Sequence, residues 1–257
     1  MTFRPAAVVT GGASGIGAAT AARMRTAGWT IHVLDRNVIA TSDGPADGAG
    51  PARFTHPVDI TDLATLSDIA ASIGPIDALV TAAGVNLRPD DGPVDRLSLD
   101  AWHRTLDVNL TGTMLTVRAF LPTLTDGGAV VTVGSTAGLA ATPGVDAYTA
   151  SKGAIIALTR VWASDFARFG IRVNCVCPGN TDTPLLDGIL AGIPDERRGQ
   201  TPQQRTATAD EVAEVIAFLA SSAPSYLSGA IIPVDGGATA HLAGVPFARR
   251  RAPRTGP

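Results

Sequence analysis

The sequence predicts an α/β protein, a single domain built on a doubly wound parallel sheet with helices on both faces. Apolar strand-like runs alternate with helical patterns along most of the chain, which is the order of parallel βαβ units. The 257 residues are 45% hydrophobic and only 17% charged, enough to bury a large core. Neither a repeat nor an internal linker interrupts the pattern. We expect residues 1–245 to form this domain and the arginine-rich residues 246–257 to form a flexible tail.

The first unit is a strand over Ala6–Thr10, a glycine-rich turn over 11–17 and a helix over Ala18–Ala27. Glycines permit the tight turn and let the backbone approach a pyrophosphate, which the helix N-terminus then stabilises. A glycine-rich turn alone can be an ordinary βα connection. The strand before it and the helix after it favour a dinucleotide site and a Rossmann-like fold.

The second strand, Thr30–Leu34, ends at Asp35. A carboxylate at this point suits the two hydroxyls of an adenosine ribose and repels a 2′-phosphate, so it favours NAD over NADP. Arg36 leaves the alternative open, because an arginine there can accommodate a phosphate. A solvated charge at a strand end is the other interpretation of Asp35.

The middle of the chain continues the alternation. Small residues in 81–84 suit a backbone that passes close beneath a cofactor. The expected elements are a loop or frayed helix over 38–52, a strand over Phe54–Val58 followed by Asp59 and Ile60, a helix from Thr61 or Asp62 to about Ile73, a strand over Asp77–Val80, a polar loop over Leu87–Leu97 and a long helix from Ser98 towards Leu121.

Ser135 follows a strand over Val130–Val133. Tyr148 comes later in the chain, and Lys152 lies four residues after Tyr148. If Tyr148 opens a helix, this spacing places phenol and ammonium on one face. A neighbouring lysine lowers the pKa of a phenol, as acid–base catalysis near neutral pH requires. The chain has 19 arginines, and Lys152 is its one lysine. Asn109, in a predicted helix among apolar neighbours, is either a structural amide with buried partners or a group that holds a water or backbone near the site.

In the last part of the chain, the sequence predicts a helix from Tyr148 to about Phe169 that is apolar on nearly every side. Since the sheet covers one side, we expect a partner subunit on the other. Leu185, Leu186 and Ile189 form an apolar insert that is either a lid over a substrate or a packing helix. The remaining expected elements are a strand over Arg172–Val176, a helix over Asp210–Ser221 and a strand over Ile231–Val234.

Several classes of function are disfavoured. The net charge is −3 and no basic stripe crosses the domain, which argues against a nucleic-acid partner. No apolar stretch is long enough to span a membrane, and the four histidines lack metal-ligand spacing. Cys175 and Cys177, two apart in a strand, predict buried thiols in a cytoplasmic protein, because a disulfide there would be strained.

Taken together, these motifs resemble the short-chain dehydrogenase/reductase family over roughly residues 5–237. The resemblance rests on the turn Thr10–Gly17, Asn109, Ser135, the Tyr148–Lys152 pair, and Pro178-Gly179 with Thr183. It implies an NAD-dependent enzyme that interconverts a secondary alcohol and a ketone, working as a homotetramer or dimer. One departure is Thr81, where the family commonly has asparagine; threonine keeps a hydroxyl but lacks the amide.

The resemblance also implies a role for each residue. Tyr148 would be the acid–base group, Lys152 would lower its pKa and bond the nicotinamide ribose, Ser135 would bind the substrate oxygen, and Asn109 would sustain a proton relay. The implied cofactor-binding residues are Gly11, Ser14, Gly15, Ile16, Gly17, Asp35, Asp59, Ile60, Thr81, Ala83, Gly84, Tyr148, Lys152, Pro178, Gly179, Thr181 and Thr183.

Two other functions stay open. One is an NADPH-dependent ketoreductase of the 3-oxoacyl-carrier type, and the other is a non-catalytic nucleotide-binding regulator on the same fold. The residues expected near the site favour an apolar alcohol or ketone as substrate. Arg88 and Arg205 are the candidate cations for an acidic substrate group, although nothing in the sequence places them.

Overall fold

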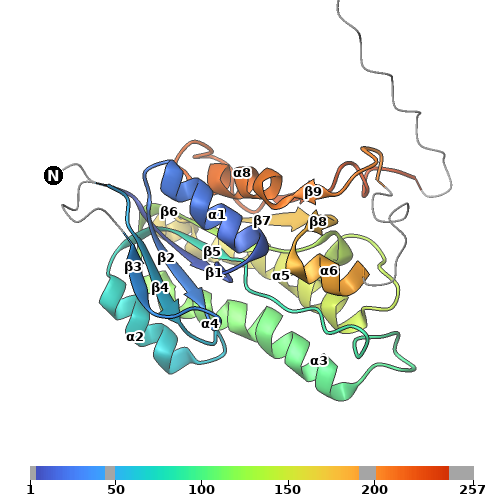
Figure 1. Ribbon diagram of the computed structural model, residues 1–257. Helices are drawn as coiled ribbons and strands as arrows, with labels where there is room; N and C mark the ends of the chain where they lie inside the picture. Colours follow the sequence, from blue (N-terminus) through green and yellow to red (C-terminus); the bar gives the residue numbers. More distant parts are fainter. Residues whose placement is uncertain (1–3, 44–49, 191–200, 243–257) are drawn as a thin grey trace, which may run out of the picture.

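A computed structural model describes residues 4–43, 50–190 and 201–242 of the chain, with side chains described up to residue 187 in the second range. An eight-stranded sheet in the order β10-β7-β6-β5-β1-β2-β4-β3 forms the centre (Figure 1). Every neighbouring pair is parallel except β3 with β4. The strands are β1 (Ala6–Thr10), β2 (Thr30–Asp35), β3 (Thr41–Asp43), β4 (Arg53–Pro57), β5 (Ile76–Thr81), β6 (Leu124–Val133), β7 (Arg172–Pro178) and β10 (Ile231–Val234).

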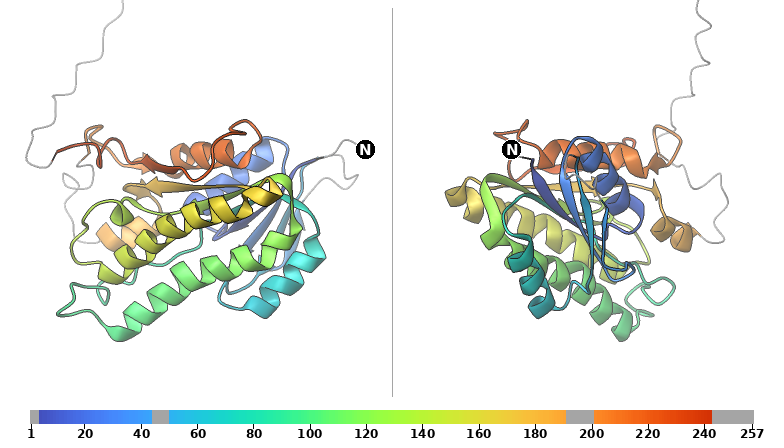
Figure 2. Two further views of the ribbon diagram at one scale, coloured as in Figure 1. Left: turned by 180° about the vertical axis from the view of Figure 1, so that it is seen from behind. Right: turned by 60° about the vertical axis from the view of Figure 1, so that its left-hand side comes forward.

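Helices cover both faces of this sheet, as predicted for a doubly wound fold (Figures 1 and 2). The α-helices are α1 (Gly15–Thr26), α2 (Leu63–Ile73), α3 (Leu99–Leu106), α4 (Thr113–Phe120), α5 (Asp146–Asp165), α6 (Pro184–Leu190) and α8 (Ala209–Ala220). Because side chains alternate along a strand, β1 serves both faces. Val9 packs in the core beneath α1 and α8, whereas Val8 packs in the core beneath α2, α4 and α5.

The strand order reverses between β1 and β5. From β1 the chain passes outward to β2 and β4 on one side, and β5, β6 and β7 follow on the other. In open α/β sheets, ligands bind outside the carboxyl ends of the strands at such a switch point. The turns after β1 and β5 carry the glycine-rich segment and residues 82–84, so the topology places the predicted cofactor residues together.

Most predicted elements are confirmed to within a few residues, and one expectation is wrong. Residues 41–43 form the short strand β3 where we expected a loop or a frayed helix, because the backbone pairs with the open edge of β4. The predicted helical run from Ser98 towards Leu121 is confirmed, and the structure adds that it comprises α3, a π-helix over Asp107–Gly112 and α4. A small second sheet, β8 (Thr181–Asp182) with β9 (Ala207–Thr208), was not predicted. The predicted C-terminal tail lies outside the described residues.

The helix that carries Tyr148 begins at Asp146, two residues earlier than predicted. Its first turn is satisfied from a distant part of the chain. Both oxygens of the Asp91 carboxylate accept backbone hydrogen bonds, from Ala147 at 3.0 Å and from Tyr148 at 2.9 Å. Four backbone N–H groups at a helix start lack partners within the helix, and an acceptor side chain there determines where the helix begins.

Candidate active site

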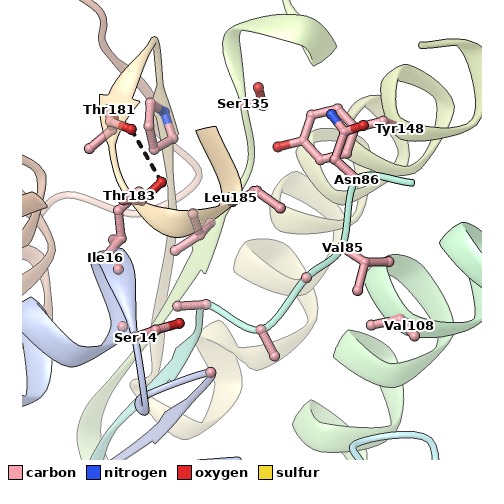
Figure 3. A pocket seen from close by; sticks show the side chains of 18 of the residues that line it. Ser14, Ile16, Val85, Asn86, Val108, Ser135, Tyr148, Thr181, Thr183 and Leu185 are labelled. Atoms are coloured by element: carbon pink, nitrogen blue, oxygen red, sulfur yellow. Dashed lines mark hydrogen bonds between the residues drawn. The ribbon is translucent and has the colours of Figure 1, made fainter. Parts of the chain in front are cut away.

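A cavity of about 400 Å³ lies at the carboxyl ends of the central strands. Figure 3 shows Ser135 and Tyr148 at one end of it and Ser14 and Ile16 at the other. The predicted site residues that line it are Gly11, Ser14, Gly15, Ile16, Gly17, Asp35, Asp59, Ile60, Ala83, Gly84, Ser135, Tyr148, Lys152, Pro178, Gly179, Thr181 and Thr183. Thr81 and Asn109 do not line it, and they lie buried behind its wall.

The glycine-rich turn packs so closely that side chains cannot replace its glycines. Gly11 has a φ of +67°, and a Cβ on it would lie 2.7 Å from the Cα of Ala83. A Cβ on Gly17 would overlap the carbonyl oxygen of Gly11. The turn leads directly into α1, so backbone N–H groups and the helix N-terminus face the cavity. This arrangement fits the pyrophosphate of a dinucleotide.

The acidic end of the cavity is formed by Asp35 and Asp59. Asp35 accepts backbone hydrogen bonds from Ala13 at 3.1 Å and from Asn37 at 2.9 Å, which orient its carboxylate beside the glycine turn. Asp59 lies 3.8 Å from the Arg36 guanidinium. Hydrogen bonds from the backbone and hydroxyl of Thr61 lower the pKa of Asp59, and Arg36 lowers it further. A carboxylate has about four acceptor positions, so Asp35 retains capacity for ribose hydroxyls.

Tyr148, Lys152 and Ser135 meet at the other end. The Lys152 Nζ lies 5.6 Å from the centroid of the Tyr148 ring and donates a hydrogen bond to the Val133 carbonyl at 2.9 Å. Ser135 is the cap of the 3₁₀ turn Thr136–Gly138, where its hydroxyl accepts a bond from the Ala137 amide at 3.1 Å. The predicted spacing of four therefore brings phenol and ammonium to one face of α5, next to a serine hydroxyl.

The pKa of Tyr148 is raised, and the prediction that it would be lowered is wrong for this structure. Burial disfavours the charged phenolate and is the largest cause, while a hydrogen bond with Ser135 acts in the opposite direction. Burial also lowers the pKa of Lys152 to about 8, against a weaker opposing effect of the nearby cysteines. The sequence could not predict these effects, because it does not reveal how far the fold encloses the two side chains.

Asn109 holds a backbone group beside the cavity, which is one of the two roles considered for it. Its Oδ1 accepts a bond from the Val85 amide at 2.7 Å, and its Nδ2 donates to the Val85 carbonyl at 2.9 Å and to the Ser151 hydroxyl at 3.1 Å. Asn109 lies within the π-helix. It thereby links the segment after β5 to α5.

Asp91 lies outside the cavity lining but positions the helix of Tyr148, and it was not predicted from the sequence. It is 1% exposed and ties the loop after β5 to the first turn of α5 through Ala147 and Tyr148. Its partners lie 56 and 57 residues away, and no local pattern distinguishes it from the neighbouring Asp90. The structure also separates the two candidate arginines. Arg88 lines the cavity, whereas Arg205 does not and binds Glu211 through two hydrogen bonds.

The apolar insert after β7 contributes to the cavity wall. It forms α6, from which Leu185 and Leu186 line the cavity, while the side chain of Ile189 lies outside the described part. Thr183 precedes it and donates a hydrogen bond to the Thr181 carbonyl at 3.2 Å (Figure 3). Within the described residues, no group of three metal-ligating side chains occurs, and no helix is long and apolar enough to cross a membrane.

Comparison with known proteins agrees with this geometry. Residues 11–239 match the family model described as enoyl-(acyl carrier protein) reductase. The chain is 40% identical to the cis-4-hydroxycyclohexanecarboxylate dehydrogenase of Sinomonas cyclohexanicum, over 91% of this chain and 96% of that protein. It is 36% identical to the meso-2,3-butanediol dehydrogenase of Serratia marcescens, over 91% and 94%.

Solved structures show the same relationship. The aldohexose dehydrogenase of Thermoplasma acidophilum superposes with a TM-score of 0.81 at 28% identity, covering 96% of this chain and 98% of that one. Levodione reductase superposes with a TM-score of 0.82 at 25% identity, covering 93% and 98%. The matched model, the related sequences and the arrangement of the cavity lead to one conclusion: the chain belongs to the short-chain dehydrogenase/reductase family.

Proposed function

We propose that the protein is an NAD-dependent dehydrogenase that interconverts a secondary alcohol and the corresponding ketone. The observation that carries the proposal is the meeting of Ser135, Tyr148 and Lys152 in one cavity with the glycine-rich turn and Asp35. An acid–base group, a hydroxyl donor and a dinucleotide cradle are the parts that this reaction requires from a protein. Relatives whose names denote alcohol dehydrogenases support it.

The chain's residues manage one proton and one oxygen. In the direction of oxidation, the alcohol oxygen binds at Ser135 and gives its proton to Tyr148, while the carbon loses a hydride and becomes a carbonyl. A bound nicotinamide cofactor supplies or accepts that hydride. Oxidation uses Tyr148 as the phenolate, which accepts the alcohol proton, and reduction uses it as the phenol, which protonates the ketone; burial raises the pKa of Tyr148 and thereby favours the phenol form. We assign Asn109 to a relay that exchanges this proton with solvent.

NAD is the proposed cofactor in preference to NADP. The cofactor would be held by residues 11–17, Asp59, Ile60, 83–84 and 178–183. Lys152 would bind its nicotinamide ribose. Asp35 presents a carboxylate at the ribose position, where a 2′-phosphate would be repelled. Arg36, the cation that could offset this repulsion, already lies 3.8 Å from Asp59.

The proposed substrate is a secondary alcohol or ketone on a compact, largely apolar frame. Val85, Val145, Leu185 and Leu186 are among the residues that line the cavity. Two relatives from Sinomonas cyclohexanicum act on cis- and trans-4-hydroxycyclohexanecarboxylate, so we propose a hydroxylated six-membered ring or an alcohol of similar size.

We further propose a cytoplasmic homo-oligomer, a tetramer or a dimer. The outer side of α5 exposes Ala150, Ala157 and Val161, the last of which is 51% exposed. An apolar strip of this kind on a long helix is suited to packing against a second copy. Two free, buried cysteines are consistent with a reducing compartment.

The test is turnover by the purified full-length protein with NAD(H) and NADP(H), using cyclic and acyclic secondary alcohols and their ketones. Tyr148→Phe should lose at least about 10³-fold in kcat while still binding NADH, because the phenol's proton is removed but its ring is kept. Undiminished turnover by Tyr148→Phe would exclude this mechanism. A clear preference for NADPH with 3-oxoacyl thioesters would favour the ketoreductase alternative, and NADH binding without any turnover would favour the regulator.

A further inference from the structure

We propose that Arg88 is a carboxylate-binding residue of the substrate site, so that the preferred substrate is a hydroxy acid or oxo acid whose carboxylate lies remote from the reacting carbon. The inference rests on the proposed function and specifies its substrate class. Arg88 belongs to the segment after β5 and lines the cavity, with its side chain partly buried.

The guanidinium of Arg88 has unused hydrogen-bonding capacity. A guanidinium carries five N–H donors, and the described residues offer it one acceptor, the Pro143 carbonyl at 3.2 Å from Nη2. Its Nε is buried without a hydrogen-bond partner among these residues. A buried unpaired donor costs free energy, and a ligand that accepts from it removes that cost.

No protein carboxylate neutralises this charge within the described part of the chain. Three cationic side chains line the cavity there: Arg36 lies near Asp59, Lys152 donates to Val133, and Arg88 is the third. The carboxylates that line the cavity, Asp35 and Asp59, lie at its cofactor end. The substrate end therefore combines apolar and neutral polar side chains, Asn86 among them, with one positive charge, which suits a largely apolar frame bearing an anion.

Two contacts fix Arg88 relative to Tyr148. Arg88 binds Pro143, five residues before Tyr148, and Asp91, three residues after Arg88, binds the Tyr148 amide. The cation and the phenol thus belong to one end of the cavity and approach a substrate from two different elements. The acid would bind Arg88 while its hydroxyl or carbonyl oxygen meets Tyr148 and Ser135. A planar guanidinium with paired donors matches a carboxylate better than an ammonium does.

The test compares the binding of cyclohexanecarboxylate with that of the neutral cyclohexanecarboxamide, by calorimetry on the NADH-loaded full-length enzyme. We expect the carboxylate to bind at least tenfold more tightly. Arg88→Gln should weaken carboxylate binding by roughly 10- to 100-fold, the range for loss of a charge-assisted hydrogen bond, and should remove the preference over the carboxamide. Arg88→Lys should retain part of the preference for the carboxylate over the carboxamide.

The matched control is Arg96→Gln. Arg96 lies in the same loop, does not line the cavity and is 77% exposed, so its removal changes the net charge equally and should leave the preference intact. If Arg88→Gln fails to fold, a reduced preference in Arg88→Lys still supports the proposal. Equal binding of the two probes by the unmodified enzyme, an undiminished preference in Arg88→Gln, or an undiminished preference in Arg88→Lys where Arg88→Gln does not fold, would refute it.

Turnover separates this inference from the proposed function. With cis-4-hydroxycyclohexanecarboxylate, Arg88→Gln should raise KM far more than it lowers kcat, and the ratio of kcat/KM for this acid to that for 4-methylcyclohexanol should fall. Oxidation of 4-methylcyclohexanol without any preference for the acid would refute the Arg88 site and leave the proposed function standing. Arg88-dependent carboxylate binding without turnover of any alcohol would support the Arg88 site and refute the proposed function.

Discussion

The carboxylate of Asp91 lies 2.9 Å from the backbone nitrogen of Tyr148 and accepts its hydrogen bond. The second oxygen accepts the Ala147 amide at 3.0 Å, so one buried side chain satisfies two amides in the first turn of α5. A negative charge at a helix N-terminus also interacts favourably with the helix dipole. The loop after β5 therefore determines where the helix of Tyr148 and Lys152 begins.

Replacing Asp91 by alanine should destabilise the fold by about 1–3 kcal/mol, because two buried amides lose their acceptor. It should also lower kcat, since the first turn of α5 positions Tyr148. Asp91→Asn, which keeps one acceptor oxygen, should lose less on both counts. Asp90→Asn is the control, because Asp90 is an exposed neighbour. Thermal unfolding and steady-state kinetics measure the effects, and wild-type values for Asp91→Ala would contradict the assigned role.

Thr81→Val should leave the free energy of unfolding unchanged or raise it slightly. The Thr81 hydroxyl is buried and has no hydrogen-bond partner among the described residues, so removing it relieves an unsatisfied group at constant shape. Thr10→Val on the neighbouring strand is the matched comparison, because the Thr10 hydroxyl accepts the Ala83 amide at 3.2 Å. Thr10→Val should lower the free energy of unfolding by about 1 kcal/mol. Urea unfolding of both variants checks this, and a reversed order would show that Thr81 makes an important hydrogen bond.

Asn109→Ala should weaken the link between the π-helix and Val85 and cost about 2–3 kcal/mol, since both backbone groups of Val85 lose their partner. Ser151→Ala removes a single partner of the same amide and should cost less. A relay role for Asn109 adds a kinetic effect, so kcat of Asn109→Ala should fall at temperatures where the variant is fully folded. Normal kcat under those conditions would restrict Asn109 to holding the backbone.

The contribution of Lys152 to the free energy of unfolding should change with pH in the alkaline range. Its pKa is about 8 in the folded protein against 10.5 as its ordinary value, so between these values the unfolded chain binds more protons. Stability of the wild type relative to Lys152→Met should therefore rise from pH 8 to 10.5, by roughly 3 kcal/mol in total at 1.4 kcal/mol per pKa unit. Below pH 8 the difference should be constant. Urea unfolding at pH 7, 9 and 10.5 measures it, and parallel curves would contradict a buried ammonium.

The sequence predicted the sheet and the cavity well because both depend on local signals. Strands of Val, Ile and Ala mark the sheet, and the turn Gly11–Gly17 and the pair Tyr148–Lys152 are short motifs whose spacing carries their geometry. Their positions at strand ends then follow from the parallel topology. Local patterning was thus sufficient for the residues that approach a cofactor.

The misses involve contacts between distant residues. Asp91 meets α5 across more than fifty residues, and β3 exists because the edge of β4 is available. The π-helix around Asn109 has the same apolar spacing as an ordinary helix, and nothing local marks the change. The raised pKa of Tyr148 depends on burial by several elements together, which a pattern of two residues cannot reveal.

The two attachments of the segment after β5 have a practical consequence for changing specificity. Asn109 holds its start at Val85 and α5 holds Asp91, so residues 86–90 form a bridge between two fixed ends. A saturation library confined to 86–88 would vary the surface offered to a substrate while leaving both anchors, and with them the helix of Tyr148, in place. Libraries that also randomise 91 should yield mostly inactive or unstable clones, because Asp91 holds α5 through its side chain.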